Sequence, residues 1–571
     1  MSRSQRPRIR VAIVGGGISG IAQAIRLKEQ LGSKVEITIF EKAAEPGGIW
    51  RDSRWPGAGV DVPIHLYSLY SDLKADWSTV YASQPEVLEY WKGLISKYEL
   101  EGLFRFNTEW IGSSWSEEAQ SHTLTLKRHP SGETYEFIAD VLISANGPLS
   151  TPLIPKLPGL SSFKGVYFHN LRWRSDVDLT NKRVAVVGNG SSGIQLVPGV
   201  AAIPGVQLTH FIRSGGYFIP KQNTEYSPLV KFAFRWLPGV QHVYRFTLFL
   251  ESNQRSRARN NPAPSPTVQE KALLKYLAAE APPQYLDLLR PTYPLGCKRV
   301  AFDLDWLKSL HRDNVHLVKD KLMSANEEGL VTEDGTTHPF DVIIFATGAD
   351  VAQHGLGLNI GLKGEGGVEL REYWKSLGGP QAYLGVAVPS FPNHFTVLGP
   401  NAATTSWGFT IGLKSLFIAR LVKGLVDNNL SSIQPKQEPF ERANAEIRAK
   451  LAPSNMNSSQ CSNWSRVGGK GLLTVPNWTT GFGVIQQTRR IQWDDWKAVE
   501  RVHDGSRKGS ALVSVDVGRR VRRRQLKRVI KLSLPFLITL VLRLTPAGES
   551  FTDKILGKVR DLVGRELSAG F

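Results

Sequence analysis

The sequence predicts an α/β fold with two Rossmann-type nucleotide-binding domains and a helical insertion. A G-x-G-x-x-G turn occurs twice, first from Gly15 and again from Gly188, and each copy follows a β-branched apolar run and opens a helical stretch. Such glycines allow a tight turn and a close approach of the backbone to a pyrophosphate, whose charge then meets the helix N-terminus. One such turn is a weak signal, whereas two in the required strand-turn-helix setting are a strong one.

The first unit starts with an apolar strand at residues 11–14 and is predicted to bind FAD. Its second strand, at residues 35–40, ends in Glu41. A carboxylate at that place accepts hydrogen bonds from ribose hydroxyls and repels a 2′-phosphate. The residues expected to contact the cofactor, from the turn and from a Gly/Pro/aromatic loop suited to a flat ring system, are Gly15, Gly17, Ser19, Gly20, Glu41, Gly48, Trp50, Trp55 and Asp61.

The second unit is built in the same way and is predicted to bind NADPH. The strand that follows its glycine turn, at residues 208–212, ends in Arg213 and Ser214. A guanidinium at that place is suited to binding a 2′-phosphate. The expected contacts are Gly188, Gly190, Ser191, Ser192, Gly193, Gln195, Arg213 and Ser214.

The remaining elements are divided between these two units. Alternating residues at 123–128 and 134–137 predict antiparallel strands laid over the first sheet. An aromatic segment from residue 217 to about 294 is expected to be helical, and the first unit resumes with a last strand before Asn401 and a helix at 408–425. The predicted divisions are 1–150 (FAD-binding, first part), 151–220 (NADPH-binding, first part), 221–295 (helical insertion), 296–348 (NADPH-binding, second part), 349–500 (FAD-binding, second part) and 501–571 (tail).

The composition excludes several other classes of protein. With 41% hydrophobic and 21% charged residues, the chain has the make-up of an ordinary globular protein. Cys297 and Cys461 form no C-x-x-C, so neither a disulfide scaffold nor a dithiol flavin reductase is expected. The net charge is +19, yet no zinc-ligand spacing, RNA-binding signature or DNA-reading helix accompanies it, so we expect neither a metal site nor a nucleic-acid partner. The basic N-terminus lacks an apolar segment, which favours a cytoplasmic protein.

The tail is first basic and then apolar. Residues 519–528 contain seven Lys and Arg and no acid, and an uncharged run of eleven residues follows at 532–542. A spanning helix needs about 20 apolar residues, whereas a basic cluster beside a shorter run is typical of a helix in the headgroup region of an anionic leaflet. Residues 551–567 form a second amphipathic stripe. Peripheral contact with an intracellular membrane and packing on the protein's own surface both agree with this pattern.

A motif between the two units resembles the fingerprint of a known family. Phe163, Gly165, His169 and Trp173 match F-x-G-x-x-x-H-x-x-x-W, the mark of class I Baeyer–Villiger monooxygenases in the flavin-containing monooxygenase superfamily. The resemblance covers residues 9 to about 480 and is strongest to the fungal branch that acts in secondary metabolism. The sequence departs from the family pattern at two places, and both concern the shape of the substrate pocket. They are Arg174 after the fingerprint, and Gly215, Gly216 and Tyr217 after the second nucleotide strand.

This resemblance implies a monooxygenase that uses FAD, NADPH and O2 to insert one oxygen atom beside a ketone carbonyl, giving an ester or lactone. Arg299 matches the family's catalytic arginine, and Asp61 matches the carboxylate that orients it, although a generic salt bridge is the simpler alternative. Arginine stays protonated in proteins, so its expected role is to stabilise negative charge. Lys298 would join Arg213 around the 2′-phosphate, unless it is a solvated surface lysine.

Other roles and functions stay open at this point. The resemblance places His169 on the linker between nucleotide domains, where it transmits domain motion or is structural, and we assign it no general-base role. Trp50 and Trp55 either border the isoalloxazine or belong to the core. The alternatives to ketone oxidation are N- or S-hydroxylation by a flavin monooxygenase and a non-catalytic, membrane-tethered flavin scaffold. The ketone, expected in polyketide or terpenoid biosynthesis, is not identified by the sequence.

Overall fold

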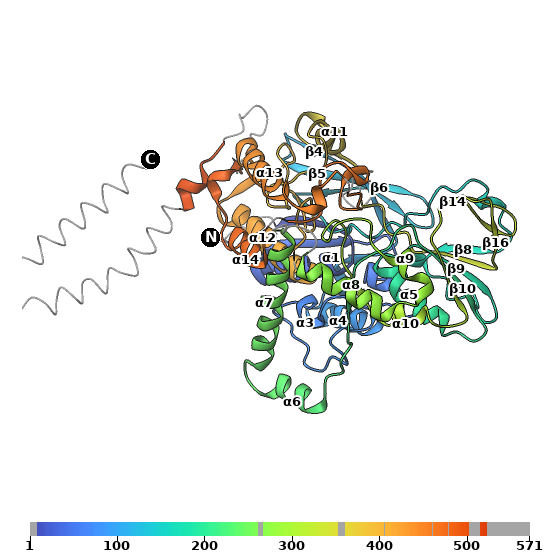
Figure 1. The fold of residues 1–571 in the computed structure, drawn as a ribbon. Helices are drawn as coiled ribbons and strands as arrows, with labels where there is room; N and C mark the ends of the chain where they lie inside the picture. The colour runs from blue at the N-terminus through green and yellow to red at the C-terminus, as the bar shows by residue number, and fades with distance from the viewer. Residues whose placement is uncertain are drawn as a thin grey trace, which may run out of the picture.

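Two parallel sheets organise the computed structural model, which describes residues 8–260, 267–351, 360–404, 406–459, 461–477, 479–501 and 514–521 (Figure 1). The first sheet has the strand order β19-β7-β1-β2-β3, and all neighbouring strands are parallel. Its strands are β1 (Ile9–Val14), β2 (Val35–Phe40), β3 (Phe104–Arg105), β7 (Val141–Ser144) and β19 (His394–Thr396). Strands buried on both faces form near-continuous apolar runs, which is why the sequence predicted them.

The second sheet repeats this arrangement with the order β13-β10-β9-β17-β8, again entirely parallel. Its strands are β8 (Val166–His169), β9 (Arg183–Val187), β10 (Gln207–Phe211), β13 (Val315–Val318) and β17 (Val342–Phe345). The fingerprint is therefore more than the expected linker, because its residues 166–169 form the edge strand β8 and pair with β17. The prediction missed this strand because it is short and half of it is exposed.

In each unit, the helix after the glycine turn packs against its own sheet. Helix α1 (Ile18–Leu31) shares the first core with α12 (Trp407–Asp427), and α5 (Ser191–Ala201) belongs to the second core. The chain therefore returns to the first unit through β19 and α12, as predicted. The other core helices are α2 (Ile49–Asp52), α3 (Ile64–Tyr67), α4 (Gln84–Lys97), α10 (Trp306–Ser309), α11 (Leu370–Ser376), α13 (Gln437–Leu451) and α14 (Gly481–Thr488).

The predicted helical insertion is present, with one correction at its start. It contains α6 (Pro228–Trp236), α7 (Val240–Asn260), α8 (Val268–Glu280) and α9 (Leu286–Leu289). Its first residues form instead the short strand β11 (Phe218–Pro220), which pairs with β12 (Ala301–Asp303). In Figure 1, α6 and the adjoining part of α7 project away from the two sheets.

Smaller sheets flank these units. The predicted antiparallel strands are β5 (Ser121–Arg128) and β6 (Thr134–Ala139), in a sheet with β4 (Thr108–Ser116) and β18 (Gly361–Lys363). The other flanking strands are β14 (Leu322–Ala325), β15 (Gly329–Thr332), β16 (Thr337–Pro339), β20 (Leu430–Pro435) and β21 (Trp496–Glu500).

The start of the tail packs on the rest of the protein. Val517 is buried in the first core, Ser514 pairs with Val499, and Arg520 forms an ion pair with Glu500 at 3.0 Å. The rest of the basic cluster and the apolar stretches at 532–542 and 551–567 lie outside the described residues. Within the described part of the chain, no helix is both long and apolar enough to cross a membrane.

Candidate active site

The two glycine turns share one backbone geometry. Gly15 has a φ of +107° and Gly188 a φ of +109°, a region that other L-residues rarely adopt. A Cβ on Gly15 would lie 2.5 Å from the Ala145 carbonyl oxygen, and one on Gly188 would lie 2.6 Å from that of Ala346. Each turn is thus held against the end of β7 or β17. Each places the N-terminus of the following helix at the carboxyl end of the strands.

The later glycines of each turn have different functions. A Cβ on Gly20 or Gly193 would lie 2.0 Å from the carbonyl oxygen of Gly15 or Gly188, so these glycines allow the helix to pack closely. A Cβ on Gly190, in contrast, would meet no described atom within 4 Å. Close packing therefore fixes the second helix, while the middle of its turn leaves room for a ligand.

Glu41 is tied to the first turn. Its carboxylate is buried and accepts hydrogen bonds from Gly16 N at 2.7 Å and from Ala43 N at 2.9 Å. Arg51 Nη1 lies 3.3 Å from Glu41 Oε1 and supplies the neutralising charge. The residue at the end of β2 is thus held in a fixed direction beside the helix N-terminus of α1.

A large cavity joins the two turns. Its volume of about 1390 Å³ exceeds the roughly 300–1,000 Å³ of an ordinary ligand pocket, so it has room for more than one ligand. The predicted site residues that line it are Gly15, Gly17, Ser19, Glu41, Gly48, Trp50, Trp55, Asp61, Ser191, Ser192, Gln195, Lys298 and Arg299. The predicted residues that do not line it are Gly20, Gly188, Gly190, Gly193, Arg213 and Ser214.

Lys298, Ser214 and Arg213 come together at the end of β10. Lys298 Nζ donates a hydrogen bond to Ser214 Oγ at 2.9 Å and lies 4.4 Å from the centre of the Tyr293 ring. Burial lowers the pKa of Lys298, and the positive charge of Arg213 lowers it further. Two cations that repel each other in this way would be stabilised by an anion bound between them.

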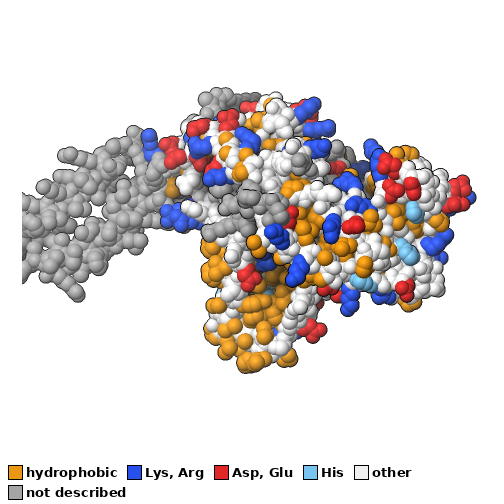
Figure 2. Space-filling view, viewed as in Figure 1, with side chains coloured by type: hydrophobic (Ala, Val, Ile, Leu, Met, Phe, Trp, Pro, Cys, Tyr) orange, Lys and Arg blue, Asp and Glu red, His pale blue; other side chains and the backbone are white. Residues whose placement is uncertain are grey.

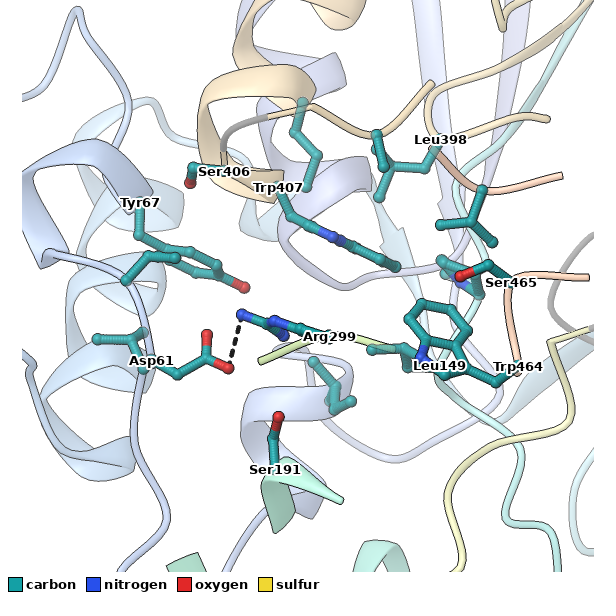
Figure 3. A pocket seen from close by; sticks show the side chains of 18 of the residues that line it. Asp61, Tyr67, Leu149, Ser191, Arg299, Leu398, Ser406, Trp407, Trp464 and Ser465 are labelled. Carbon is teal, nitrogen blue, oxygen red and sulfur yellow. Dashed lines mark ion pairs between the residues drawn. The ribbon is translucent and has the colours of Figure 1, made fainter. Parts of the chain in front are cut away.

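Arg299 and Asp61 form an ion pair on the cavity wall, with Arg299 Nη2 2.7 Å from Asp61 Oδ2 (Figure 3). The Arg299 side chain is 49% exposed, so much of the guanidinium faces the cavity rather than protein. Trp407 and Trp464 line the same cavity. The pair thus presents a directed positive charge to whatever occupies the cavity.

Lys221 is a second cation close to this pair. Its Nζ donates to the Val60 carbonyl oxygen at 2.9 Å and lies 4.0 Å from the centre of the Tyr81 ring. Burial lowers the pKa of Lys221 to about 8, with Asp61 opposing the shift and Arg299 adding to it. Lys221 therefore fixes the backbone immediately before Asp61.

The two predicted tryptophans, Trp50 and Trp55, are both buried and both line the cavity. Trp50 Nε1 donates to the Tyr67 hydroxyl at 2.9 Å, and burial raises the pKa of that tyrosine. Trp55 Nε1 is buried and has no hydrogen-bond partner among the described residues.

His169 has a structural environment. It is buried, its Nδ1 accepts a hydrogen bond from Leu171 N at 3.1 Å, and burial lowers its pKa to about 4. The ring is thus neutral near pH 7 and ill-suited to general-base chemistry. Trp173 is half-buried and packs edge-on against Phe168 at 5.3 Å between ring centres.

The two departures from the family pattern have local explanations. A Cβ on Gly215 would lie 2.2 Å from the Leu289 carbonyl oxygen, so the insertion packs against a glycine there. Tyr217 is buried and its hydroxyl donates to Glu270 and to the Tyr293 carbonyl oxygen. Arg174 is exposed and pairs with Asp176 at 2.5 Å, away from the cavity lining.

Sequence reasoning missed the wall opposite Asp61. A disulfide joins Cys297 to Cys461, which lie 164 residues apart. This bond brings Asn463, Trp464 and Ser465 into the cavity lining, and Asn463 Nδ2 donates to the Cys297 carbonyl oxygen at 3.2 Å. Tyr67 and Lys221 were missed as well. No short motif surrounds any of these residues, so the sequence offered no signal.

Comparison with known proteins gives a consistent picture. The flavin-binding monooxygenase-like family model matches residues 8–230. A Baeyer–Villiger monooxygenase of Pseudomonas aeruginosa is 31% identical over 484 residues, covering 83% of this chain and 89% of that protein. The FAD-binding monooxygenase ktnD of Aspergillus niger is 28% identical over 510 residues, covering 86% and 81%. The structure of cyclohexanone monooxygenase from Rhodococcus sp. Phi1 bound to NADP+ superposes with a TM-score of 0.75 at 25% identity, covering 87% and 100%.

Proposed function

Because the chain belongs to the Baeyer–Villiger flavin monooxygenases, we propose that Arg299 and Asp61 form its site of oxygen insertion into a ketone. The enzyme is an FAD- and NADPH-dependent monooxygenase that performs Baeyer–Villiger oxidation. The observation that supports the assignment to these two residues is their 2.7 Å ion pair on the wall of the cavity between the two glycine turns.

The residues at the two turns fit the two cofactors. Helices α1 and α5 begin at the turns, so their free N–H groups would hold the pyrophosphates. Glu41 would bind the ribose of FAD, since a carboxylate accepts about four hydrogen bonds and can serve a hydroxyl besides its present donors. When bound, FAD reduced by NADPH supplies the activation of O2 from which the inserted oxygen comes.

Arg299 would act as a fixed positive charge beside the ketone. Because arginine stays protonated, it stabilises the negative charge that develops on the former carbonyl oxygen and transfers no proton. Asp61 would hold the guanidinium in one direction through a charge-assisted hydrogen bond. Lys221 would act through Asp61 as a positioning residue, because it holds the Val60 carbonyl group.

Arg213, Ser214 and Lys298 would bind the 2′-phosphate of NADPH. They lie together at the end of β10, where burial and then the charge of Arg213 lower the pKa of Lys298. A phosphate there would accept charge-assisted hydrogen bonds from both cations.

We further place the ketone in the biosynthesis of a polyketide or terpenoid secondary metabolite. The support is the resemblance to the fungal branch of the family and the similarity to the FAD-binding monooxygenase ktnD of Aspergillus niger. Peripheral membrane contact through the tail is a separate proposal, and it rests on the sequence of residues 519–542.

NADPH consumption by the purified full-length enzyme, with and without ketones, tests the proposed reaction. We expect ketone-dependent consumption, with one ester or lactone formed for each NADPH that is coupled to the substrate. Oxidation of amines or sulfides without preference for ketones would indicate a hydroxylating monooxygenase instead. A protein that consumes no NADPH under any condition would be a scaffold, and the proposal would be wrong.

A further inference from the structure

The projection formed by α6 and α7 exposes an unusual amount of apolar surface. Figure 2 shows hydrophobic side chains gathered over this part of the molecule. Along α6, Leu229, Phe232 and Trp236 recur at helical spacing, and their exposed fractions are 76%, 55% and 66%. The turn and α7 continue the surface with Leu237, Val240, Val243, Phe246 and Leu250. We call these eight residues the apolar knob.

The opposite faces of the same helices are firmly attached to the enzyme. Arg245 is buried and donates to the Ser68 carbonyl oxygen at 3.0 Å, and Arg235 pairs with Asp76 at 3.0 Å. Phe234 packs edge-on against His65, with 5.1 Å between ring centres. The exposed apolar face therefore belongs to a hairpin that is fixed to the rest of the protein. Contiguous exposed apolar patches of this kind mark interaction sites.

The charges around the knob indicate an anionic partner. Residues 226–250 contain no Asp or Glu. Arg245 is buried and Arg235 pairs with Asp76, so Lys231 supplies the remaining positive charge of this stretch. Amphipathic helices with Trp, Phe and Leu on one face and cations beside them are typical of the headgroup region of an anionic leaflet.

We propose that the apolar knob docks the enzyme on the surface of an anionic phospholipid bilayer. Trp236, Phe232 and Phe246 enter the headgroup region, and Lys231 and His242 face the lipid phosphates. Helix α6 has nine residues, so the hairpin lies in the interface and does not span the bilayer. This surface is separate from the basic tail.

Docking would also place the cavity near the bilayer. Helix α7 carries the knob at one end, and further along it Ser252 and Arg255 line the cavity. Leu250 is exposed on the knob only two positions before Ser252. Resting on the proposed function, this continuity indicates a lipophilic ketone that partitions into the membrane.

Vesicle co-sedimentation of the full-length protein tests the docking. The knob variant carries Phe232→Ser, Trp236→Ser and Phe246→Ser. The control carries Ile138→Ser, Met323→Ser and Val368→Ser, which are exposed apolar residues of β6, β14 and the segment before α11. We expect the wild type and the control to bind phosphatidylserine-containing vesicles equally, and the knob variant to bind at least tenfold more weakly. Equal binding by all three proteins, or no binding by the wild type, would overturn the proposal.

A second measurement isolates the knob from the tail. Brominated phosphatidylcholine/phosphatidylserine vesicles quench tryptophans that enter the bilayer, so quenching should fall measurably in Trp236→Phe. Unchanged quenching would show that Trp236 stays in water and would contradict the proposal. Light scattering in the absence of lipid tests whether the knob instead joins two copies of the chain. In that case the knob variant would have half the molar mass of the wild type.

A kinetic measurement tests only the inference that the substrate is lipophilic and comes from the membrane. With vesicles present, the knob variant should lose kcat/KM for a long-chain ketone and keep it for a short, water-soluble one. Equal kcat/KM values for the wild type and the knob variant on the long-chain ketone would refute delivery from the membrane. If neither ketone is oxidised, the proposed function fails, whereas the sedimentation result still decides the docking.

Discussion

Arg172, within the fingerprint, forms an ion pair with Asp52 at the end of α2, with 3.3 Å between Nη1 and Oδ2. Asp52 also binds Arg51 Nε at 2.8 Å, and Arg51 in turn lies 3.3 Å from Glu41. Alternating charges therefore connect the edge of the second sheet to the carboxylate at the first glycine turn. Arg51 and Glu41 are buried, whereas the Arg172 side chain is 45% exposed.

Replacing Arg51 should therefore be far more damaging than replacing Arg172. Arg51→Leu leaves the buried Glu41 without its cation, and removing one partner of a buried pair costs about 3–5 kcal/mol. Arg172→Leu removes a surface pair that is worth at most about 1 kcal/mol. Urea unfolding and FAD retention on desalting measure both effects. Identical midpoints for the two variants would contradict this account of the chain of charges.

Arg299→Ala should separate the two halves of the reaction. The variant should bind FAD and be reduced by NADPH, because we assign the Arg299 charge to oxygen insertion only. Ester formation should fall at least ~100-fold, the usual loss when a preorganised charge is removed from a transition state. Asp61→Ala should be milder, since it removes orientation and leaves the charge. Anaerobic stopped-flow reduction and product chromatography measure the two halves, and ester formation within tenfold of the wild type would refute the catalytic role.

Arg213→Ala should discriminate between the two nicotinamide coenzymes. A hydrogen bond to a charged phosphate is worth about 1.5–3 kcal/mol, or roughly ten- to over a hundredfold in affinity. The KM for NADPH should rise by that factor, and the KM for NADH should change little because NADH lacks the 2′-phosphate. Steady-state kinetics with both coenzymes supply the test. Equal increases in KM for NADPH and NADH would show that Arg213 does not contact the 2′-phosphate.

Lys414 should make stability depend on pH in a defined direction. It is fully buried, its Nζ donates to the Leu384 carbonyl oxygen at 2.6 Å, and burial lowers its pKa to about 7. The unfolded chain keeps a lysine pKa of about 10.4, so between these values it binds the proton that the folded state has lost. This group therefore adds stability as pH rises through the window, by up to ~1.4 kcal/mol per unit.

The matched comparison for this group is Lys414→Met. The variant removes the buried charge, so it should gain most over the wild type near pH 6, and its advantage should shrink toward pH 10. Other titrating groups are common to both proteins and cancel in the difference. Urea unfolding at several pH values gives the measurement, and a difference that is constant with pH would show that Lys414 does not titrate in this range.

Two truncations should behave differently. Ending the chain after residue 510 removes Val517 from the core and the partner of Glu500, whereas ending it after Val521 keeps both. We expect the shorter protein to melt several degrees lower, because one buried valine is worth about 1.5–3 kcal/mol. Differential scanning calorimetry compares them. Equal Tm values would show that residues 514–521 contribute nothing to the core.

The fold was predictable where local chemistry dictates it. Parallel strands need continuous apolar runs and nucleotide turns need glycine, so β1, β9 and both turns were correctly placed. The pairing of Arg299 with Asp61 came from the family resemblance, not from any local pattern. Contacts between distant segments carry no local signal, which is why Lys221, Trp464 and the bond between the two cysteines were missed.

Because Cys297 and Cys461 form a disulfide, a thiol reductant in the buffer can change the covalent structure of the enzyme. Cys297 directly precedes Lys298 and Arg299, and Cys461 precedes the segment with Trp464. Opening the bond with a thiol would remove the covalent link between these two adjoining segments of the cavity lining. Preparations purified with and without dithiothreitol are therefore two different samples of this enzyme. Kinetic constants from the two should be compared only after the free thiols have been counted.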